Sequence, residues 1–353
     1  MKSFSRLTFA ASLLASVVSG NAAPPRVSGN RPVVIEVPVP ESQSPALPKR
    51  EPGSLAAVLP DDKAEAEAPA DASKTRSPAT ELKRARDQLL KCSSISANLV
   101  ETVSVLEKGY KAEGRYLQRA LKPNNWHMRL ELVVKIGESQ GSLLEVCDGE
   151  VLWTRMEIDL GRKRSVKEGK DITITRRNVA EIMSAARKIG DQKIETSLIA
   201  SMGLGGLPGL IASIEENMKF SSIKEDTLRE QPVLVIQGTW TDSYASKLRA
   251  GQQRQGGGSS LLPVYVPDSV RLYFDRETGF PHRIEYRKKV PGRDVQRPMV
   301  TLDFLDVALN QPINNSEFDY EPPAGTQPQE LTKFFVDRLT PADTKAQPGG
   351  PLK

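Results

Sequence analysis

The sequence has few of the side chains on which most catalytic and metal sites depend. Its 353 residues include two cysteines and two histidines, and the spacing of Cys92, Cys147, His127 and His282 matches no zinc-binding pattern. We therefore predict no metal and no other cofactor. No serine stands in a G-x-S-x-G motif, and a catalytic triad would have to use one of the two histidines. Carboxylates are plentiful but are not paired at a recognisable spacing, so we expect a protein that is not an enzyme.

A long apolar run and a strong charge imbalance are also missing. The apolar run from Leu7 to Val18 is shorter than the ~20 residues that a membrane helix needs. It follows Lys2 and Arg6 and is followed by small residues up to Ala22, which is the order of a secretory signal. We predict that residues 1–22 are a cleaved signal peptide and not a buried helix, so that the mature chain is soluble outside the cytoplasm. Acidic and basic residues are interleaved, which argues against nucleic-acid binding.

Composition divides the remaining chain into three parts. Residues 23–77 are rich in proline and alanine and contain too few apolar residues to bury a core, so we predict a disordered tether. Residues 78–336 have the length of one large β domain, and residues 337–353 are predicted to be a disordered tail. Cys92 and Cys147 would form a disulfide only if their Cα atoms came within about 7 Å. The sequence leaves open whether they pair or remain two buried thiols.

Apolar periodicity predicts a helix, then strands, then a helical block, then strands again. Residues 80–91 favour a helix. In residues 126–136 every second side chain, from Trp126 to Ile136, is apolar, and Arg129, Glu131 and Lys135 point the other way, as in a half-buried strand. Asp148-Gly149 is typical of a tight hairpin turn. Between Asn178 and Phe220 the spacing of the apolar residues becomes helical. Further strands are predicted at residues 231–240, 269–275, 282–288 and 299–306. This order predicts an α+β fold in which helices cover one face of the sheet.

Two glycine-containing segments show no recognisable binding motif. The glycine-rich segment Gly203–Gly209 lacks the lysine and hydroxyl residue of a phosphate-binding loop, so it is either a hinge within a helical lid or a plain interhelical turn. Residues 249–260, which contain three consecutive glycines, are predicted to be a flexible loop.

Four segments, in order, resemble the periplasmic outer-membrane lipoprotein carrier family, the LolA/LolB-like proteins. They are the helix Glu81–Lys91 running into CSSISANLVETVSV, then AEGRYLQRALKPNNWHMRLEL at Ala112–Leu132, LLEVCDGEVLW at Leu143–Trp153, and LNQPINNSEFDYEPPAGT at Leu309–Thr326, which is similar to the family's last strand and its ending. The resemblance implies a periplasmic protein with an incompletely closed antiparallel β-barrel, a strongly curved sheet covered by a helical lid. Its apolar cavity would accept acyl chains.

One residue departs from the family pattern at a place that bears on the lid. The family usually has an arginine before the proline of the second segment, where it helps to hold the lid shut. This sequence has Lys122 before Pro123. A lysine keeps the charge but lacks the planar guanidinium, so a lid latch at Lys122 would be weaker.

The resemblance suggests a set of cavity residues, each of which could equally be ordinary core. The predicted lipid-binding set comprises Trp126, Met128, Leu130, Leu132, Val134, Leu144, Val146 and Trp153 on the sheet, with Leu207, Leu210, Ile211 and Ile214 on the helices. The implied function is that of a monomeric carrier of lipid or of an acylated lipoprotein towards the outer membrane. An inner-membrane release complex and an outer-membrane acceptor would be its partners.

Two other functions fit the same sequence. One is an envelope-stress sensor or regulatory interaction module resembling the RseB sensor domain. The other is a structural surface protein with a filled core and no ligand. An open apolar cavity would favour a carrier or a sensor over a structural protein.

Overall fold

The computed structural model describes residues 77–105, 108–122, 125–136, 139–159, 171–190, 205–253, 262 and 266–339. Several predicted segments lie outside the described residues. They are the signal peptide, the tether up to residue 76, the first two residues of the glycine-rich segment Gly203–Gly209, and the tail beyond residue 339. Within the described part of the chain, no helix is both long enough and apolar enough to cross a membrane.

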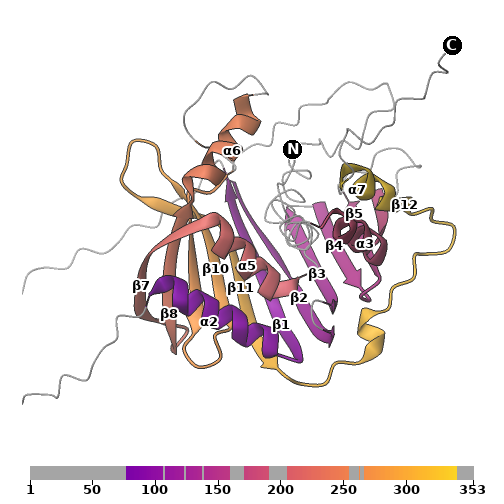
Figure 1. Ribbon diagram of the computed structural model, residues 1–353, viewed down its shortest axis with the longest axis horizontal. Helices are drawn as coiled ribbons and strands as arrows, with labels where there is room; N and C mark the ends of the chain where they lie inside the picture. The colour runs from indigo at the N-terminus through magenta and orange to yellow at the C-terminus, as the bar shows by residue number, and fades with distance from the viewer. Residues whose placement is uncertain are drawn as a thin grey trace, which may run out of the picture. The chain divides into compact units, whose positions relative to one another are not determined.

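Twelve strands form one sheet, which does not close on itself (Figure 1). The strand order is β12-β6-β5-β4-β3-β2-β1-β11-β10-β9-β8-β7. All neighbouring pairs are antiparallel except β12 with β6. The bounds are β1 Ser94–Val105, β2 Lys108–Lys122, β3 Asn125–Ile136, β4 Ser139–Cys147, β5 Val151–Asp159, β6 Asp171–Asn178, β7 Met218–Leu228, β8 Gln231–Trp240, β9 Ser269–Asp275, β10 Pro281–Lys289, β11 Gln296–Leu309 and β12 Gln329–Glu330. The predicted α+β fold with an incompletely closed, curved antiparallel sheet is confirmed.

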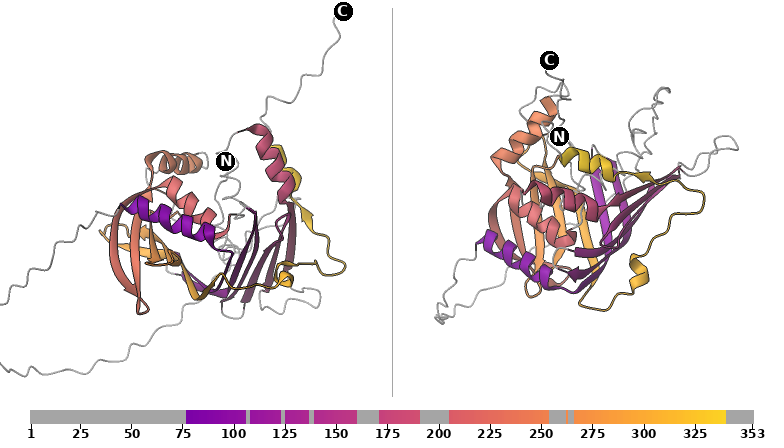
Figure 2. Two further views of the ribbon diagram at one scale, coloured as in Figure 1. Left: turned by 60° about the horizontal axis from the view of Figure 1, so that its bottom comes forward. Right: turned by 45° about the vertical axis from the view of Figure 1, so that its right-hand side comes forward.

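The helices gather in two groups at different parts of the sheet (Figures 1 and 2). Helices α2 (Pro78–Lys91) and α5 (Gly206–Asn217) lie side by side, joined by an ion pair between Arg86 and Glu215. Helices α3 (Val179–Ile189) and α7 (Thr332–Leu339) lie beside β5 and β6. Helix α6 (Asp242–Gln253) follows β8. The helices predicted from periodicity correspond to α2, α3 and α5.

Local sequence explains where these helices begin and end. Leu82, Ala85 and Leu89 share one face of α2 and are fully buried, as expected from their helical spacing. The side chain of Asn178 caps α3 by accepting a hydrogen bond from the Glu181 amide at 2.9 Å. Gly190 ends α3 in the left-handed region at φ 75°, which glycine adopts without strain.

The alternation predicted for β3 is present and gives the sheet two different faces. Leu132 and Val134 are 2% and 1% exposed, whereas Val133 between them is 40% exposed. We call the side that carries Leu132 and Val134 the inner face and the opposite side the outer face. Ala112 on β2 pairs directly with Val134 and therefore lies on the inner face too.

Several elements differ from the prediction. Residues 249–253, predicted as loop, form the last turns of α6; residues 254–260 lie outside the described part. The helical pattern stops at Asn217, and Met218 to Phe220 begin β7. Strand β6 was not predicted. Helix α7 continues to Leu339, beyond the predicted domain end at residue 336, because it packs against α3 and Thr332 at its start is hydrogen-bonded to Glu330.

The segment after β11 is a strap and not the predicted last strand. Strand β11 ends at Leu309, and Asn310 follows in the left-handed region at φ 59°. The chain then runs across the outer face, where the short helix η1 (Asn315–Phe318) lies against β3. We call residues 310–328 the strap. It ends where β12 pairs with β6 and α7 begins.

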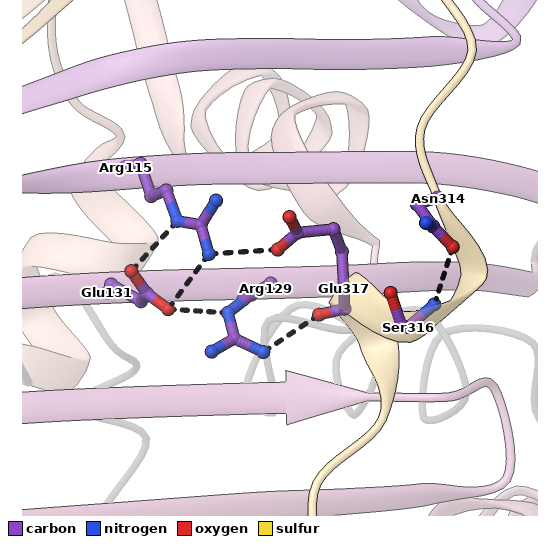
Figure 3. Close-up of polar contacts among 6 residues, drawn as sticks. All are labelled: Arg115, Arg129, Glu131, Asn314, Ser316 and Glu317. Carbon is purple, nitrogen blue, oxygen red and sulfur yellow. Dashed lines mark hydrogen bonds and ion pairs between the residues drawn. The ribbon is translucent and has the colours of Figure 1, made fainter.

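A network of charged side chains fastens the strap to the outer face (Figure 3). Arg115 on β2 donates to Glu131 at 2.9 Å and to Glu317 of the strap at 2.8 Å. Arg129 on β3 donates to Glu131 at 2.6 Å and to the backbone carbonyl of Glu317 at 2.9 Å. Each arginine therefore donates to both Glu131 and Glu317 and is oriented by these two partners. Ion pairs contribute most to stability when they form such a network.

Gly114 on β2 is required by the close approach of β3. A Cβ atom at this position would lie 1.8 Å from the backbone oxygen of Glu131, so the two strands would have to separate. We predict that Gly114→Ala lowers the free energy of unfolding by at least about 2 kcal/mol, as overpacking against rigid backbone does. Chemical denaturation of the full chain measures this value.

Gly109 on the same strand provides the matched control. A Cβ atom there would meet only one atom, the Val103 carbonyl oxygen at 4.0 Å. Gly109→Ala should therefore change the free energy of unfolding by less than about 0.5 kcal/mol. Equal effects of the two substitutions would show that the strands are not packed as described.

Candidate functional site

The inner face is the face that the helices cover. Tyr116 and Gln118 lie on it, and both accept a hydrogen bond from the backbone amide of Leu207 in α5, at 3.2 Å and 3.0 Å. The Tyr116 hydroxyl also donates to the Gln118 side-chain oxygen. The inner face is therefore joined to the first turn of α5.

The predicted residues of β3 and α5 lie in this covered layer. Trp126, Met128, Leu132 and Val134 are buried on the inner face, and Leu207, Ile211 and Ile214 of α5 are buried as well. Leu130 and Leu210 are partly buried and pack against the same core. Whether this set lines a cavity that holds a ligand stays a prediction.

Three predicted cavity residues lie on the other side of the sheet. Met128 pairs with Cys147 and Arg129 pairs with Val146, so Val146 shares the outer face with Arg129. Leu144 and Trp153 lie on the outer face for the same reason. The prediction that these three share a face with the inner residues of β3 is wrong. The error arose because apolar residues occur at both odd and even positions of β4. The sequence pattern of β4 therefore did not show which of its two sides faces the core.

The inner positions of β4 and β5 belong to residues that the sequence analysis did not include in the lipid-binding set. They are Leu143, Glu145 and Cys147 on β4 and Leu152, Thr154 and Met156 on β5. Met156 is only partly buried and packs against the core. The inner face between the two helix groups thus includes Leu130 and Met156 on β3 and β5, both with some exposed surface.

The lid latch predicted at Lys122 stays a prediction. Lys122 is the last residue of β2 and pairs with Asn125; its side chain and Pro123 lie outside what the structure describes. Among the described residues, hydrogen bonds to the first turn of α5 come from Tyr116 and Gln118, and Gln118 is completely buried. A glutamine at an inner position of a strand was the signal in the sequence, since buried amides need partners.

Glu101 is a buried carboxyl group without a partner on the inner face. It is 1% exposed, and neither carboxyl oxygen has a hydrogen-bond partner. Its cross-strand neighbours are Ala112 on β2 and Leu302 on β11. Burial removes the carboxylate from water and so raises the pKa of Glu101 from 4.5 to about 7.

The two cysteines are separate buried thiols. Cys92 caps the C-terminal end of α2 and Cys147 ends β4, and both are free. Burial raises the pKa of the Cys92 thiol, which lowers the fraction of reactive thiolate. Of the two alternatives left open by the sequence, the structure has the unpaired one.

The two histidines lie on strands that are separated by β2, β1 and β11. His127 on β3 contacts Arg119 at 2.6 Å and the ring of Phe318 in the strap, and burial together with the Arg119 charge lowers its pKa. His282 on β10 lies 3.6 Å from Asp275. Among the described residues, no three His, Cys, Asp or Glu side chains are grouped as metal ligands.

Ionisation of Glu101 should make stability depend on pH. Below pH ~4.5 the group is protonated in both the folded and the unfolded protein. Between this pH and about 7 only the unfolded chain ionises, so stability falls as pH rises. We predict that Glu101→Gln, which cannot ionise, raises the free energy of unfolding relative to wild type by roughly 3 kcal/mol at pH 8 but not at pH 4.

Denaturant titrations of the full chain at several pH values measure this difference. Glu113→Gln is the control, because Glu113 is an exposed carboxylate on the neighbouring strand that pairs with Lys111. It should leave the pH profile near that of wild type. A Glu101→Gln profile parallel to that of wild type would contradict the buried, unpartnered state of Glu101.

The contact of Tyr116 with α5 should be measurable by amide exchange. Tyr116→Phe removes one of the two acceptors of the Leu207 amide, and a net hydrogen bond contributes about 1 kcal/mol. We expect the Leu207 amide to exchange about fivefold faster. Tyr110→Phe is the control, since Tyr110 is on the same strand and has no hydrogen bond to α5 among the described residues. If the Leu207 amide exchanged at the wild-type rate in Tyr116→Phe, the hydrogen bond between Tyr116 and α5 would be contradicted.

No protein-family model matches the sequence, and no curated protein matches it. Several solved structures are similar to the chain at low identity. One is the Pseudomonas aeruginosa MucA/MucB complex, with 11% identity and a TM-score of 0.35, covering 69% of this chain and 61% of that chain. The present chain thus spans less than two thirds of the length of that protein.

Two further similar structures are covered almost completely. LprF from Mycobacterium bovis has 12% identity and a TM-score of 0.33, covering 70% of this chain and 97% of that chain. A putative outer membrane lipoprotein-sorting protein domain from Vibrio parahaemolyticus has 10% identity and a TM-score of 0.25, covering 68% and 95%. At these low scores we argue function from the geometry of the chain itself.

Proposed function

We propose that this protein binds the acyl chain of a lipid or of an acylated lipoprotein on its inner face and carries it through the periplasm. The observation that supports this proposal is the position of Leu130, Met156 and Leu210. These apolar side chains lie between sheet and helices and are only partly buried. Apolar surface that a fold leaves open beside its core is where an apolar ligand gains most from binding.

The arrangement of the helices supports the same proposal. Helix α5 is bound to the inner face at Tyr116 and Gln118 of β2, and both α2 and α5 contact β7, whereas α3 contacts β5 and α7 contacts β6 (Figure 2). Strands β3 and β4 lie between the two pairs in the sheet order. An acyl chain lying over β3 and β4 would contact a helix pair at each side. Each CH₂ group removed from water would contribute about 0.8 kcal/mol.

The direction of transport and the partners are the finer part of the proposal. An acylated lipoprotein is the proposed cargo, passed from an inner-membrane release complex to an outer-membrane acceptor. The protein would act without catalysing a reaction. A sensor of RseB-like architecture would bind the same acyl chains but would pass on a signal to a partner protein and not the lipid itself.

Ligand extraction tests whether an acyl ligand is bound. The full chain is purified from its native envelope fraction and extracted with organic solvent, and the extract is analysed by mass spectrometry. We expect phospholipid or acylated peptide. Leu130→Lys places a charge on the inner face and should lower both the extracted ligand and the affinity for a fluorescent fatty acid by at least about tenfold.

Val133→Lys is the matched control for this experiment. Val133 lies three residues along the same strand but on the outer face, where it is 40% exposed. It should bind the fluorescent fatty acid within about twofold of wild type, with both variants shown to be folded by their unfolding midpoints. A wild-type protein that is empty and takes up no fatty acid would refute the proposal. Transfer of bound lipid to acceptor vesicles would separate a carrier from a sensor.

A further inference from the structure

Glu101 differs from every other buried carboxylate in the described part of the chain. Four such groups are at most 9% exposed: Glu81, Glu101, Glu145 and Glu285. Glu81 pairs with Arg84 at 2.7 Å, and Glu285 pairs with Arg287 at 2.6 Å. Glu145 accepts a hydrogen bond from Thr154 at 3.2 Å. Among these four described residues, only Glu101 has two carboxyl oxygens without a hydrogen-bond partner.

An unpartnered buried carboxyl is expensive to keep in a fold. Burying a polar group without a hydrogen bond is unfavourable, and burying a charged group without one is more unfavourable still. Leucine or valine at position 101 would match the inner positions beside it on β1, Leu99 and Val103, which are both buried. Buried polar groups without partners in native proteins usually have a function or meet a missing molecule.

The residues that pair with Glu101 on the neighbouring strands cannot satisfy its carboxyl group. Its direct neighbours across the sheet are Ala112 and Leu302, which offer no hydrogen-bonding side chain. Ala112 contributes only a methyl group, so a molecule lying over β2 would meet the carboxyl from that side. Beyond Ala112 on the same row of the sheet is Val134, an apolar residue of the proposed acyl site.

We propose that Glu101 is the polar contact of the inner-face site, and that it selects lipid-type ligands whose chain carries an O–H or N–H donor. This inference rests on the proposed acyl binding and adds the chemical class of the ligand. The carboxyl accepts the donor's hydrogen bond, while Ala112, Val134 and Leu132 contact the neighbouring CH₂ groups. A ligand without a donor leaves the carboxyl unpaired and binds more weakly.

Matched probes of one chain length test the selection. Tetradecanol carries a hydroxyl donor, and methyl tetradecyl ether has the same chain without it. Each probe competes with a fluorescent fatty acid for the full chain at pH 8.5, where the ionised carboxylate is an acceptor only. We expect wild type to bind tetradecanol about tenfold more tightly than the ether, which corresponds to a hydrogen bond to a charged group.

Variants assign this preference to the carboxyl group. Glu101→Leu should bind both probes equally, and Glu101→Gln, whose amide oxygen still accepts, should keep part of the preference. Glu113→Gln, on the adjacent strand but facing outward, should keep all of it. Unfolding midpoints establish that each variant is folded, and Glu101→Leu should be more stable than wild type because it removes a buried charge.

The possible results separate this inference from the proposed function. If wild type binds both probes with equal affinity, or if Glu101→Leu retains the preference, the role of Glu101 is refuted and acyl binding stands. If neither probe nor the fluorescent fatty acid binds to wild type, the proposed function itself fails, and the role of Glu101 fails with it.

Discussion

The structure depends on one constraint: the apolar inner face of an open sheet has to be removed from water. A closed barrel would cover this face with itself, but here β7 and β12 are the two free edges of the sheet order. The inner positions of β1 and β3 carry large apolar side chains such as Leu99 and Leu132. Helices α2, α5, α3 and α7 therefore supply the cover that strand pairing does not.

Specific hydrogen bonds and ion pairs on the sheet and the strap hold each helix group in place. The α5 amide of Leu207 is bound by Tyr116 and Gln118. The strap leads into helix α7 on the inner side. It crosses the outer face, where Arg115 and Arg129 bind Glu317, and it ends where β12 pairs with β6. The two faces of the sheet are thus coupled, because the outer ion pairs position the residues that lead into an inner helix. A cover attached at a few points can open without unfolding the sheet.

Regular periodicity made much of the fold predictable. The alternation of Trp126 to Ile136, which is interrupted only by the outward-facing Val133, predicted both β3 and its inner face, and Asp148-Gly149 predicted the β4–β5 hairpin, where Gly149 has φ 89°. The prediction failed where the pattern was ambiguous. In β4, Leu143 and Leu144 are both apolar, and the pairing of Met128 with Cys147 decided that Leu143 faces inward.

Interactions between distant segments were the second source of error. The strap contains NNSEFDYEPP, which has no periodicity of its own and is positioned by Arg115 and Arg129, which lie 202 and 188 residues before Glu317. Strand β6 and helix α7 likewise depend on each other through Arg176, Glu330 and Thr332. Glu101 was not singled out, because a glutamate in an alternating strand usually faces solvent. Its burial follows from its inward parity, which Leu99 and Val103 share.

The central claim is that an acyl chain binds on the inner face between the two helix groups. A fatty acid with a photoreactive diazirine on its chain, crosslinked to the full protein and followed by peptide mass spectrometry, tests it most directly. Crosslinks concentrated on peptides that contain Leu130, Met156 and Leu210 are expected, and an excess of unlabelled fatty acid should suppress them. Crosslinks confined to outer-face residues such as Val133, or none that unlabelled fatty acid suppresses, would contradict it.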